Sequence, residues 1–248
     1  MDTKSAAQTL MVLMLSASIV WPVMTYIIAK MTGAEPVKVS LYDETYCPAC
    51  RQFVKEQLGP TWKELNGIMA VDIVAYGWAE ETPLETGYNF TCQHGPDECT
   101  GNMILECAKA HVSHRHFVKL AICFMSEDSN PLPSPLVVGR KCAQRVGAKN
   151  NWSAIKTCAT SVEGLELLHE AGVKFHSLKD PEPTWVPWIL INGKQSDKAE
   201  EDLKSVICST YEGQPPAVCP SIKAQEVQGD SPSDSETPSD SNNQSSVV

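Results

Sequence analysis

Positive charge is scarce in this sequence, and it is never gathered into a run. The 248 residues include 20 Lys and Arg against 30 Asp and Glu, which gives a formal net charge of −10. A protein that binds nucleic acid needs clustered Lys and Arg to neutralise phosphates. The composition therefore excludes nucleic acid as the expected partner.

A second closely spaced cysteine pair is also missing. Cys47 and Cys50 form a single C-x-x-C, whereas a structural zinc site of the usual kind needs a second pair with similar spacing. Cys92, His94 and Cys99 offer three ligands, but the Gly-Pro between them is typical of a turn. Spare cysteines of an oxidising compartment form disulfides rather than zinc thiolates. We therefore expect no bound metal.

Charge of either sign is absent from Leu10–Ala29, a stretch rich in Leu, Met, Val and Ile. Such a segment is typical of a secretory signal or of a membrane anchor. Pro22 interrupts it, and the small residues Thr32 and Ala34 offer a cleavage site, so we expect a cleaved signal peptide over residues 1–34. An anchor is the alternative, and contact with a membrane is expected only if the leader is retained.

Apolar residues are nearly absent from the other end of the chain. From Ser221 onward one Lys stands against five acidic residues, and Ser, Pro, Asp, Asn and Gln dominate. Such a segment has too little apolar surface to fold. We expect residues 221–248 to be a disordered acidic tail and residues 35–220 to be the folded domain.

Ten cysteines are too many for an ordinary reduced cytosolic protein, and they indicate an oxidising compartment. Three Asn-X-Ser/Thr sequons support a route through the secretory pathway. We expect glycans at Asn89 and Asn151; the third sequon begins at Asn243 in the tail.

The C-x-x-C lies where a strand pattern gives way to a helical one. Val37–Tyr42 alternates between apolar and polar residues, and Arg51–Leu58 has helical spacing with Gly59-Pro60 to end it. The first sulfur of a pair in this position lies beside unpaired backbone N–H groups and the positive end of the helix dipole. Both favour the thiolate, the reactive form in disulfide exchange. The pattern indicates a redox dithiol in which Cys47, at the exposed helix end, has a strongly lowered pKa.

Strand-like alternation is missing from Tyr76 to about Leu178, although it is clear on either side. Ile68–Val74 follows the dithiol helix and completes a βαβ unit with parallel strands and a right-handed crossover. Alternation returns at Trp185–Ile191, and Asn192-Gly193 then favours a type I′ turn into an antiparallel strand. A last amphipathic helix spans about Lys198–Tyr211.

This order predicts an α/β protein with a thioredoxin-like fold. A helical, disulfide-stapled insertion over about residues 76–180 separates the βαβ unit from the C-terminal β-hairpin-α unit. The Pro-rich stretch Asn130–Pro135 is expected to be a loop between helices, for which the candidates are Glu98–His111, Phe117–Phe124 and Val162–Ala171.

Pro187 opens a strand far along the chain from the dithiol. In the thioredoxin-like arrangement a cis X-Pro bond faces the active cysteines at this point, so we expect Val186–Pro187 to be cis; a trans proline on an edge strand is the alternative. The backbone of Val186 would then pair with an extended substrate strand. Trp185 and Trp188 form either an apolar rim for the site or part of the core.

Residues 92–107 follow the pattern C-Q-H-G-x2-E-C-x2-N-x4-C. Eight fixed positions at fixed spacing are far more specific than a lone C-x-x-C. The pattern resembles the hallmark of the gamma-interferon-inducible lysosomal thiol reductase (GILT) family. Further matches in order include the C-x-x-C itself, the Val-Pro-Trp leading to Asn192-Gly193, and the remaining cysteines. The resemblance covers about Val37 to Cys219.

The resemblance implies a reductase of protein disulfides in endosomes and lysosomes, with secretion as the alternative destination. Sulfur chemistry assigns the roles: Cys47 attacks the substrate disulfide and Cys50 resolves the mixed disulfide. The reaction uses no bound cofactor but needs an external small-thiol reductant. A secreted, disulfide-rich binding protein with a permanent Cys47–Cys50 crosslink is one alternative, and an oxidase or isomerase on the same fold is another. The sequence leaves the oligomeric state open.

The eight remaining cysteines are expected to form four structural disulfides, for which 105 pairings exist. Spacing favours pairing Cys208 with Cys219 across the end of the last helix. Cys92, Cys99 and Cys107 are expected to staple the insertion. In the family view His94 and Glu98 belong to a structural motif, and we expect His94 to be a hydrogen-bonded loop residue. The cysteines concerned are Cys92, Cys99, Cys107, Cys123, Cys142, Cys158, Cys208 and Cys219.

Overall fold

The structure is a computed structural model that describes residues 34–220. The expected signal peptide, apart from its last residue, and the expected acidic tail with its sequon lie outside the described residues. Within residues 34–220, no helix is both long enough and apolar enough to cross a membrane.

A four-stranded sheet of order β2-β1-β5-β6 forms the centre of the fold. β1 (Val37–Asp43) pairs in parallel with β2 (Met69–Ala75), and β5 (Trp188–Ile191) and β6 (Lys194–Gln195) continue the sheet antiparallel. Asn192 and Gly193 both have positive φ, 49° and 81°, as a type I′ turn requires. The βαβ unit and the hairpin predicted from the sequence are confirmed, and with them the thioredoxin-like order of strands.

The helix after the dithiol is longer than its sequence suggested. It comprises α2 (Pro48–Phe53), a π-helical segment (Val54–Leu58) and α3 (Gly59–Leu65), so the expected end at Gly59-Pro60 is wrong. Gly59 donates its N–H to the Val54 carbonyl five residues back, and Pro60 then lies in the first turn of α3, where a missing N–H costs nothing.

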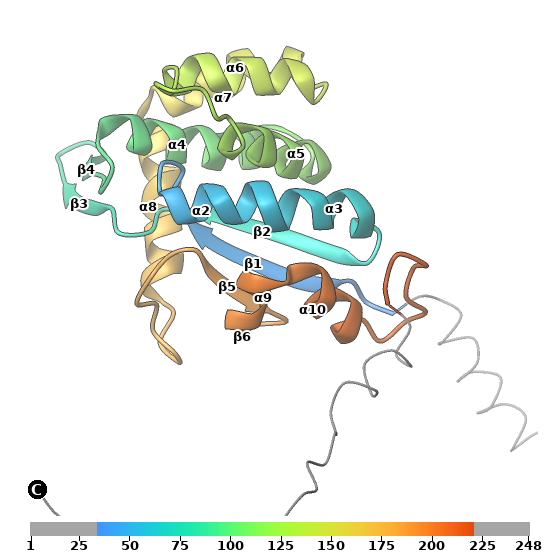
Figure 1. Ribbon diagram of the computed structural model, residues 1–248. Helices are drawn as coiled ribbons and strands as arrows, with labels where there is room; N and C mark the ends of the chain where they lie inside the picture. The colour runs from blue at the N-terminus through green and yellow to red at the C-terminus, as the bar shows by residue number, and fades with distance from the viewer. Residues whose placement is uncertain (1–33, 221–248) are drawn as a thin grey trace, which may run out of the picture.

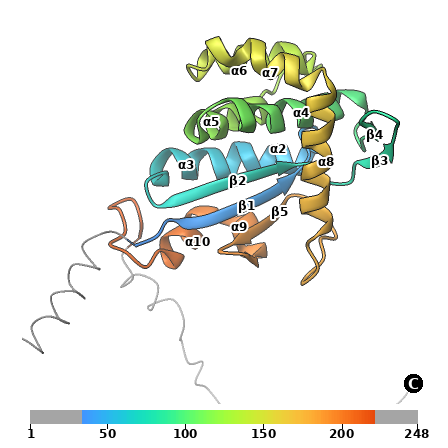
Figure 2. The same ribbon diagram turned by 180° about the vertical axis from the view of Figure 1, so that it is seen from behind.

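The insertion is mainly helical, as predicted, but it contains more helices than the sequence suggested. Figures 1 and 2 show α4 and α5 beside α2 and α3, with α6 and α7 outermost, and α8 running along the edge of this stack toward the sheet. The three expected helices are present in lengthened form, α6 begins at Pro135 after the expected loop, and α6 and α7 were not predicted. The helices are α4 (Pro96–His111), α5 (His114–Met125), α6 (Pro135–Arg145), α7 (Trp152–Ala159) and α8 (Val162–His176), with a 3-10 turn at Lys149–Asn151.

A β-hairpin also lies in the insertion, where no strand was expected. β3 (Glu80–Pro83) pairs antiparallel with β4 (Tyr88–Thr91). All four residues of β3 are exposed, so the hairpin has no buried face on that strand to produce an alternating pattern. The signal on which strand prediction depends is therefore absent here.

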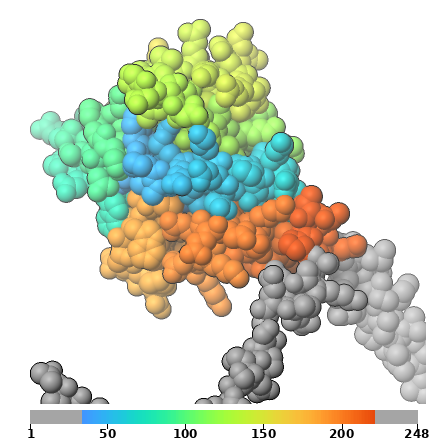
Figure 3. All heavy atoms as spheres, in the orientation of Figure 1, coloured from blue at the N-terminus to red at the C-terminus, as the bar shows by residue number. Residues whose placement is uncertain are grey.

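The last predicted helix is two helices, α9 (Asp197–Glu201) and α10 (Leu203–Thr210), separated at Asp202. Figure 3 shows the α2–α3 segment as a band between the insertion helices and the C-terminal segment. Gln57 contacts both sides of the break between α9 and α10, because its Nε2 donates to the Glu201 carbonyl at 2.8 Å and its Oε1 accepts from the Leu203 N–H.

Four disulfides join the eight cysteines outside the dithiol. Cys208–Cys219 closes the C-terminal end, as the spacing indicated. The other three disulfides hold the insertion together. Of the three cysteines expected to staple it, two are bonded to each other and the third is bonded to a later cysteine. The three disulfides are Cys92–Cys99, Cys107–Cys158 and Cys123–Cys142.

Candidate functional site: the dithiol at the start of α2

Cys47 is the N-cap of α2, and Pro48 follows as the first helical residue. Pro48 brings the φ that a helix needs and has no N–H to leave unpaired. The Cys47 sulfur accepts a hydrogen bond from the Cys50 N–H at 3.5 Å. Both cysteines are free thiols in the structure.

The two thiols are more enclosed than the sequence suggested. Cys47 was expected at an exposed helix end, but only 7% of its surface is accessible, and Cys50 is fully buried. The reason is that other segments cover the end of α2. Of the two sulfur-bearing residues, Cys47 is therefore the one with surface accessible to a substrate disulfide.

The environment lowers the pKa of Cys47 from its ordinary value of 9.0 to about 6. The largest cause is the hydrogen bond from the Cys50 thiol. Backbone N–H groups of Cys50 and Ala49 and the charge on His94 act in the same direction, while burial opposes them. The predicted helix-terminus effect is thus one contribution among several.

At Cys50 burial is the largest influence, and it raises the pKa of this thiol well above the usual range. The hydrogen bond to Cys47 and the charge on Asp43 add to this increase. The pair therefore consists of an ionisable leading sulfur and a protonated second sulfur that donates to it. Such a division of roles suits an attacking and a resolving thiol.

The Val186–Pro187 peptide lies against the dithiol and is cis, as expected. The Val186 carbonyl oxygen is 3.9 Å from the Cys47 sulfur, although the two residues are 139 positions apart in the chain. The two tryptophans beside this peptide differ: Trp188 is buried in the core, whereas Trp185 is 42% exposed. Of the two alternatives given for these tryptophans, the core applies to Trp188 and an exposed rim to Trp185.

Trp185 also lines a groove along α2. The groove has a volume of about 550 Å³ and lies between α2 and α9. Ala49, which follows Pro48 between the two cysteines, lines it together with the apolar Phe53. The remaining lining residues are polar: Gln52, Glu56, Gln57, Asp197, Glu200 and Glu201.

The C-Q-H-G segment lies beside the dithiol, which the sequence did not reveal. His94 Nδ1 is 2.6 Å from Glu98 Oε2 and 3.4 Å from Glu44 Oε2. Glu98 also accepts the His94 backbone N–H at 3.0 Å, so the ring is held from two directions. Its hydrogen-bonded state matches the expectation, but its charge also acts on Cys47.

A third carboxyl group, that of Asp43, lies near Cys50. Asp43, the last residue of β1, is completely buried, and neither of its oxygens has a hydrogen-bond partner. Burial raises the pKa of Asp43 well above its usual range, and the neighbouring Glu106 adds to the increase. Burial thus disfavours the charged form of Asp43.

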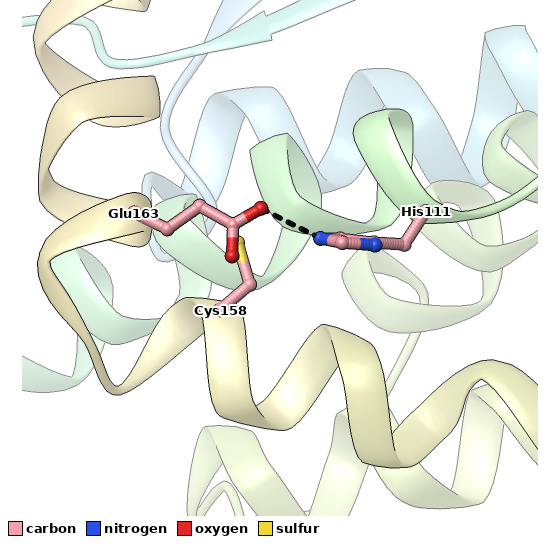
Figure 4. A group of neighbouring side chains, drawn as sticks. All are labelled: His111, Cys158 and Glu163. Atoms are coloured by element: carbon pink, nitrogen blue, oxygen red, sulfur yellow. Dashed lines mark hydrogen bonds and ion pairs between the residues drawn. The ribbon is translucent and has the colours of Figure 1, made fainter.

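Two clusters in the described residues bring metal-ligand types together, and neither gives a metal centre. Figure 4 shows His111, Cys158 and Glu163, but the Cys158 sulfur is bonded to Cys107, and His111 Nε2 is paired with Glu163 at 2.8 Å. The other cluster is Glu44, His94 and Glu98, in which His94 Nδ1 is hydrogen-bonded to Glu98 Oε2 at 2.6 Å. The zinc ligands considered from the sequence are excluded, since Cys92 is bonded to Cys99.

Comparison with known proteins agrees with this site. A family profile described as "Gamma interferon inducible lysosomal thiol reductase (GILT)" matches residues 38–146. A gamma-interferon-inducible lysosomal thiol reductase of Carassius auratus is 38% identical over 191 residues, which cover 75% of this chain and 73% of that protein. This chain belongs to the GILT family. The reductase of the same name from Mus musculus is 35% identical over 75% of this chain and 73% of its own.

Membership of the GILT family makes the chain a thiol-disulfide oxidoreductase that acts as a reductase. Enzymes of this kind typically use no prosthetic group, and their substrates are disulfide-containing proteins. Among solved structures, a reduced DsbA from Mycobacterium tuberculosis superposes with a TM-score of 0.43 at 19% identity, over 65% of this chain and 75% of that one.

Sequence reasoning found the dithiol but missed three of its neighbours. Asp43 and Glu44 directly follow the alternating strand, and a polar pair at a strand end is the one local signal that was available. His94 is 47 positions from Cys47 and belongs to another element, so no local pattern places it at the sulfur.

Proposed function

We propose that this GILT-family enzyme reduces protein disulfides in acidic endosomes and lysosomes, with Cys47 attacking and Cys50 resolving. The carrying observation is the Cys47 thiol, whose pKa is lowered to about 6 while Cys50 stays protonated beside it. The names of the relatives, lysosomal thiol reductases, support the compartment.

The lowered pKa matters most in acid. At pH 5 a thiol with the ordinary pKa of 9.0 is ionised to roughly 0.01%, whereas a pKa of about 6 gives roughly 10%, a gain of about 900-fold. A less basic thiolate is a weaker nucleophile, and with a Brønsted slope near 0.4–0.5 the loss is roughly 15- to 30-fold. The net advantage at pH 5 is therefore more than about tenfold.

The reaction balances without a bound cofactor. The Cys47 thiolate attacks one sulfur of the substrate disulfide, and the other sulfur leaves and takes a proton. Cys50 then gives up its proton and attacks the Cys47 sulfur, which releases the second substrate thiol and leaves a Cys47–Cys50 disulfide. Two equivalents of an external small thiol restore the dithiol and become a disulfide themselves.

The substrate is held by backbone contacts in this proposal. The carbonyl of Val186 lies beside the attacking sulfur, and Pro187 behind it is buried, so the Val186 backbone is fixed for pairing with an extended chain. The groove along α2 would take the residues that follow the substrate cysteine. Main-chain pairing of this kind tolerates many sequences, as a reductase of varied proteins requires.

We further propose that the mature enzyme is the domain of residues 35–220, after removal of residues 1–34 and with residues 221–248 as an unfolded tail. Asn89 and Asn151 are both exposed, which supports glycan attachment at these two sites.

The test is reduction of a denatured disulfide-containing protein at pH 5 and pH 7.4 with a small thiol as reductant. We expect turnover at pH 5, none in Cys47→Ser, and a trapped mixed disulfide in Cys50→Ser, because the resolving thiol is then missing. Turnover that survives Cys47→Ser would rule out the proposed roles.

A further inference from the structure

A small cavity lies where α5 and the end of α6 meet α3. Its volume is about 410 Å³, and Trp62 of α3 and Ile122 of α5 contribute apolar surface to its lining. Cys123, which is only half-buried, lines the cavity as well, whereas its disulfide partner Cys142 is buried. One side of a structural disulfide is therefore open to this cavity.

The charged side chains that line the cavity are both positive. They are Lys119 on α5 and Arg145, the last residue of α6, and no acidic residue lines the cavity. Within residues 34–220 neither cation belongs to an ion pair. The chain as a whole has a formal net charge of −10, so this cavity differs in sign from the rest of the protein. It is suited to an anionic ligand.

Arg145 also contacts the disulfide itself. Its Nη1 donates to the Cys123 sulfur at 3.8 Å. When a thiolate attacks a disulfide, negative charge spreads over the incoming sulfur and the two sulfurs of the bond, and a guanidinium in contact with one of them stabilises that charge. Cys142 is only 1% accessible, so the sulfur open to attack is that of Cys123.

We propose that Cys123–Cys142 is a site of thiol-disulfide exchange separate from the dithiol, and that small thiols carrying carboxylates open it at Cys123. The thiolate of such a molecule bonds to the Cys123 sulfur, and the Cys142 sulfur leaves and takes a proton. The product is a mixed disulfide on Cys123 and a free thiol at Cys142, so α5 and α6 lose their crosslink. A second small thiol attacks the mixed disulfide, releases the Cys123 thiol and becomes part of a small-molecule disulfide.

The other three disulfides lack this combination of access and positive charge. Cys107–Cys158 and Cys92–Cys99 are buried. Cys208–Cys219 is half-buried, but neither of its cysteines lines the cationic cavity. Lys204, one turn before Cys208 on α10, is paired with Glu64 at 2.6 Å. The Cys208–Cys219 bond is therefore a suitable internal reference for an exposed disulfide without free cations beside it.

The experiment uses the full chain with its dithiol replaced by Cys47→Ser and Cys50→Ser, so that only the four disulfides exchange. This parent chain is treated at pH 7.4 with glutathione, 2-mercaptoethanol or cysteamine, which apart from the sulfur carry a net negative charge, no charge and a positive charge. Opened cysteines are alkylated and mapped by mass spectrometry. The measured quantity is the opening rate of Cys123–Cys142 divided by that of Cys208–Cys219, a ratio in which the intrinsic reactivity of each thiol cancels.

The ratio should be about three- to tenfold higher with glutathione than with 2-mercaptoethanol, and lowest with cysteamine. The glutathione adduct should be on Cys123, with the free thiol at Cys142. About 1 M sodium chloride should remove most of the preference for glutathione, because it screens the charges.

Two substitutions separate the roles of the cations. Lys119→Gln should lower the ratio about threefold with glutathione and leave it unchanged with 2-mercaptoethanol, since Lys119 acts only on the charge of the ligand. Arg145→Gln should lower the ratio with both thiols, because Arg145 also contacts the sulfur. Arg140→Gln is the matched control: Arg140 is exposed on the same helix but lines a different cavity, and its loss should leave the ratio in place.

A ratio that does not depend on the charge of the thiol overturns the proposal, and so does an adduct on Cys142. A preference for glutathione that survives both Lys119→Gln and Arg145→Gln also contradicts it. Opening of the buried Cys107–Cys158 bond would reveal an unfolded variant, and the salt dependence of the parent chain then decides without any substitution in the cavity. The outcome does not depend on the proposed function, because the test protein lacks the dithiol.

Discussion

Thr45 and Asn102 join the loop before the dithiol to helix α4. The Asn102 side-chain oxygen accepts the Thr45 N–H at 3.0 Å and its hydroxyl at 2.8 Å, and both residues are completely buried. Gly101 allows this close approach, because a Cβ there would lie 2.4 Å from the Thr45 hydroxyl oxygen. The segment that carries Cys47 is thereby held against the insertion.

Replacing Asn102 with Ala should therefore destabilise the protein by about 1–3 kcal/mol, since it leaves the buried Thr45 N–H without an acceptor. Denaturation in urea measures the loss. Asn66→Ala is a suitable comparison, because the Asn66 amide only donates to a carbonyl in the last turn of α3, where water can replace it. Equal losses in the two variants would contradict the importance given to the Thr45 contact.

The sequence identified those residues whose roles depend on partners a few positions away in the chain. Cys47 and Cys50 are recognisable because their spacing is itself the functional unit. The contact between Asn102 and Thr45 spans 57 positions, and no local pattern in the sequence predicts it.

The break between α9 and α10 shows how one residue divides an element. Asp202 has a non-helical backbone, with φ −146° and ψ 75°, and its carboxylate accepts the Ser205 N–H at 3.0 Å as the N-cap of α10. Apolar spacing continues across the break, which is why the sequence predicted one helix. The acid at the boundary was the signal for a new start.

Asp202→Ala should cost about 1 kcal/mol of stability at neutral pH, while Asp202→Asn, which keeps the acceptor, should cost much less. The hydrogen bonds from Ser205 hold the pKa of Asp202 below its ordinary value. A lowered folded-state pKa gives stability that is present above the unfolded pKa and is lost as the pH falls through the folded one. The Ala penalty should accordingly shrink in strong acid, and a penalty independent of pH would argue against the cap.

Elements with one buried and one exposed face were predictable, and those without were not. β1 alternates in burial along its length and β2 alternates over its first four residues, and both strands were found. The exposed hairpin strand β3 was missed. Gly59-Pro60, usually a helix end, was overridden because the π-helical segment and the buried Trp62 and Leu65 continue the element.

Glu106 should stabilise the folded protein more in mild acid than at neutral pH, and a single substitution tests this contribution. Glu106 is almost fully buried in α4, where it accepts the Ala75 N–H at 2.9 Å, and burial raises its pKa from 4.5 to about 7. A raised folded-state pKa gives stability that is complete below the unfolded value and is lost as the pH rises through the folded one. The window is thus about pH 4.5 to 7.

Glu106→Gln, which keeps the acceptor but cannot ionise, should therefore gain stability relative to the wild type by about 1–3 kcal/mol between pH 4.5 and pH 8. Calorimetry at both values should show the Tm difference grow by several degrees. Comparing variant with wild type cancels the opposite trend that Cys47 contributes. Exposed Glu163→Gln serves as control, and a constant Tm difference for Glu106→Gln would disprove the account.

The order of the strands followed from the sequence because a βαβ unit and a tight hairpin leave few arrangements open. The arrangement of the helices in the insertion did not follow from the sequence, because helices that pack on one another are joined by contacts and disulfides between residues far apart in the chain. Cys107–Cys158, at a separation of 51 residues, is one such contact.

An enzyme that opens disulfides also has four of its own to keep. Cys107 and Cys158 have no accessible surface, so the bond at the middle of the insertion is out of reach of any thiolate, including that of a second enzyme molecule. Cys208 and Cys219 are only partly covered. The Cys208–Cys219 bond should thus be reduced before Cys107–Cys158, so that the enzyme can lose its C-terminal crosslink while it keeps the one at the middle of the insertion.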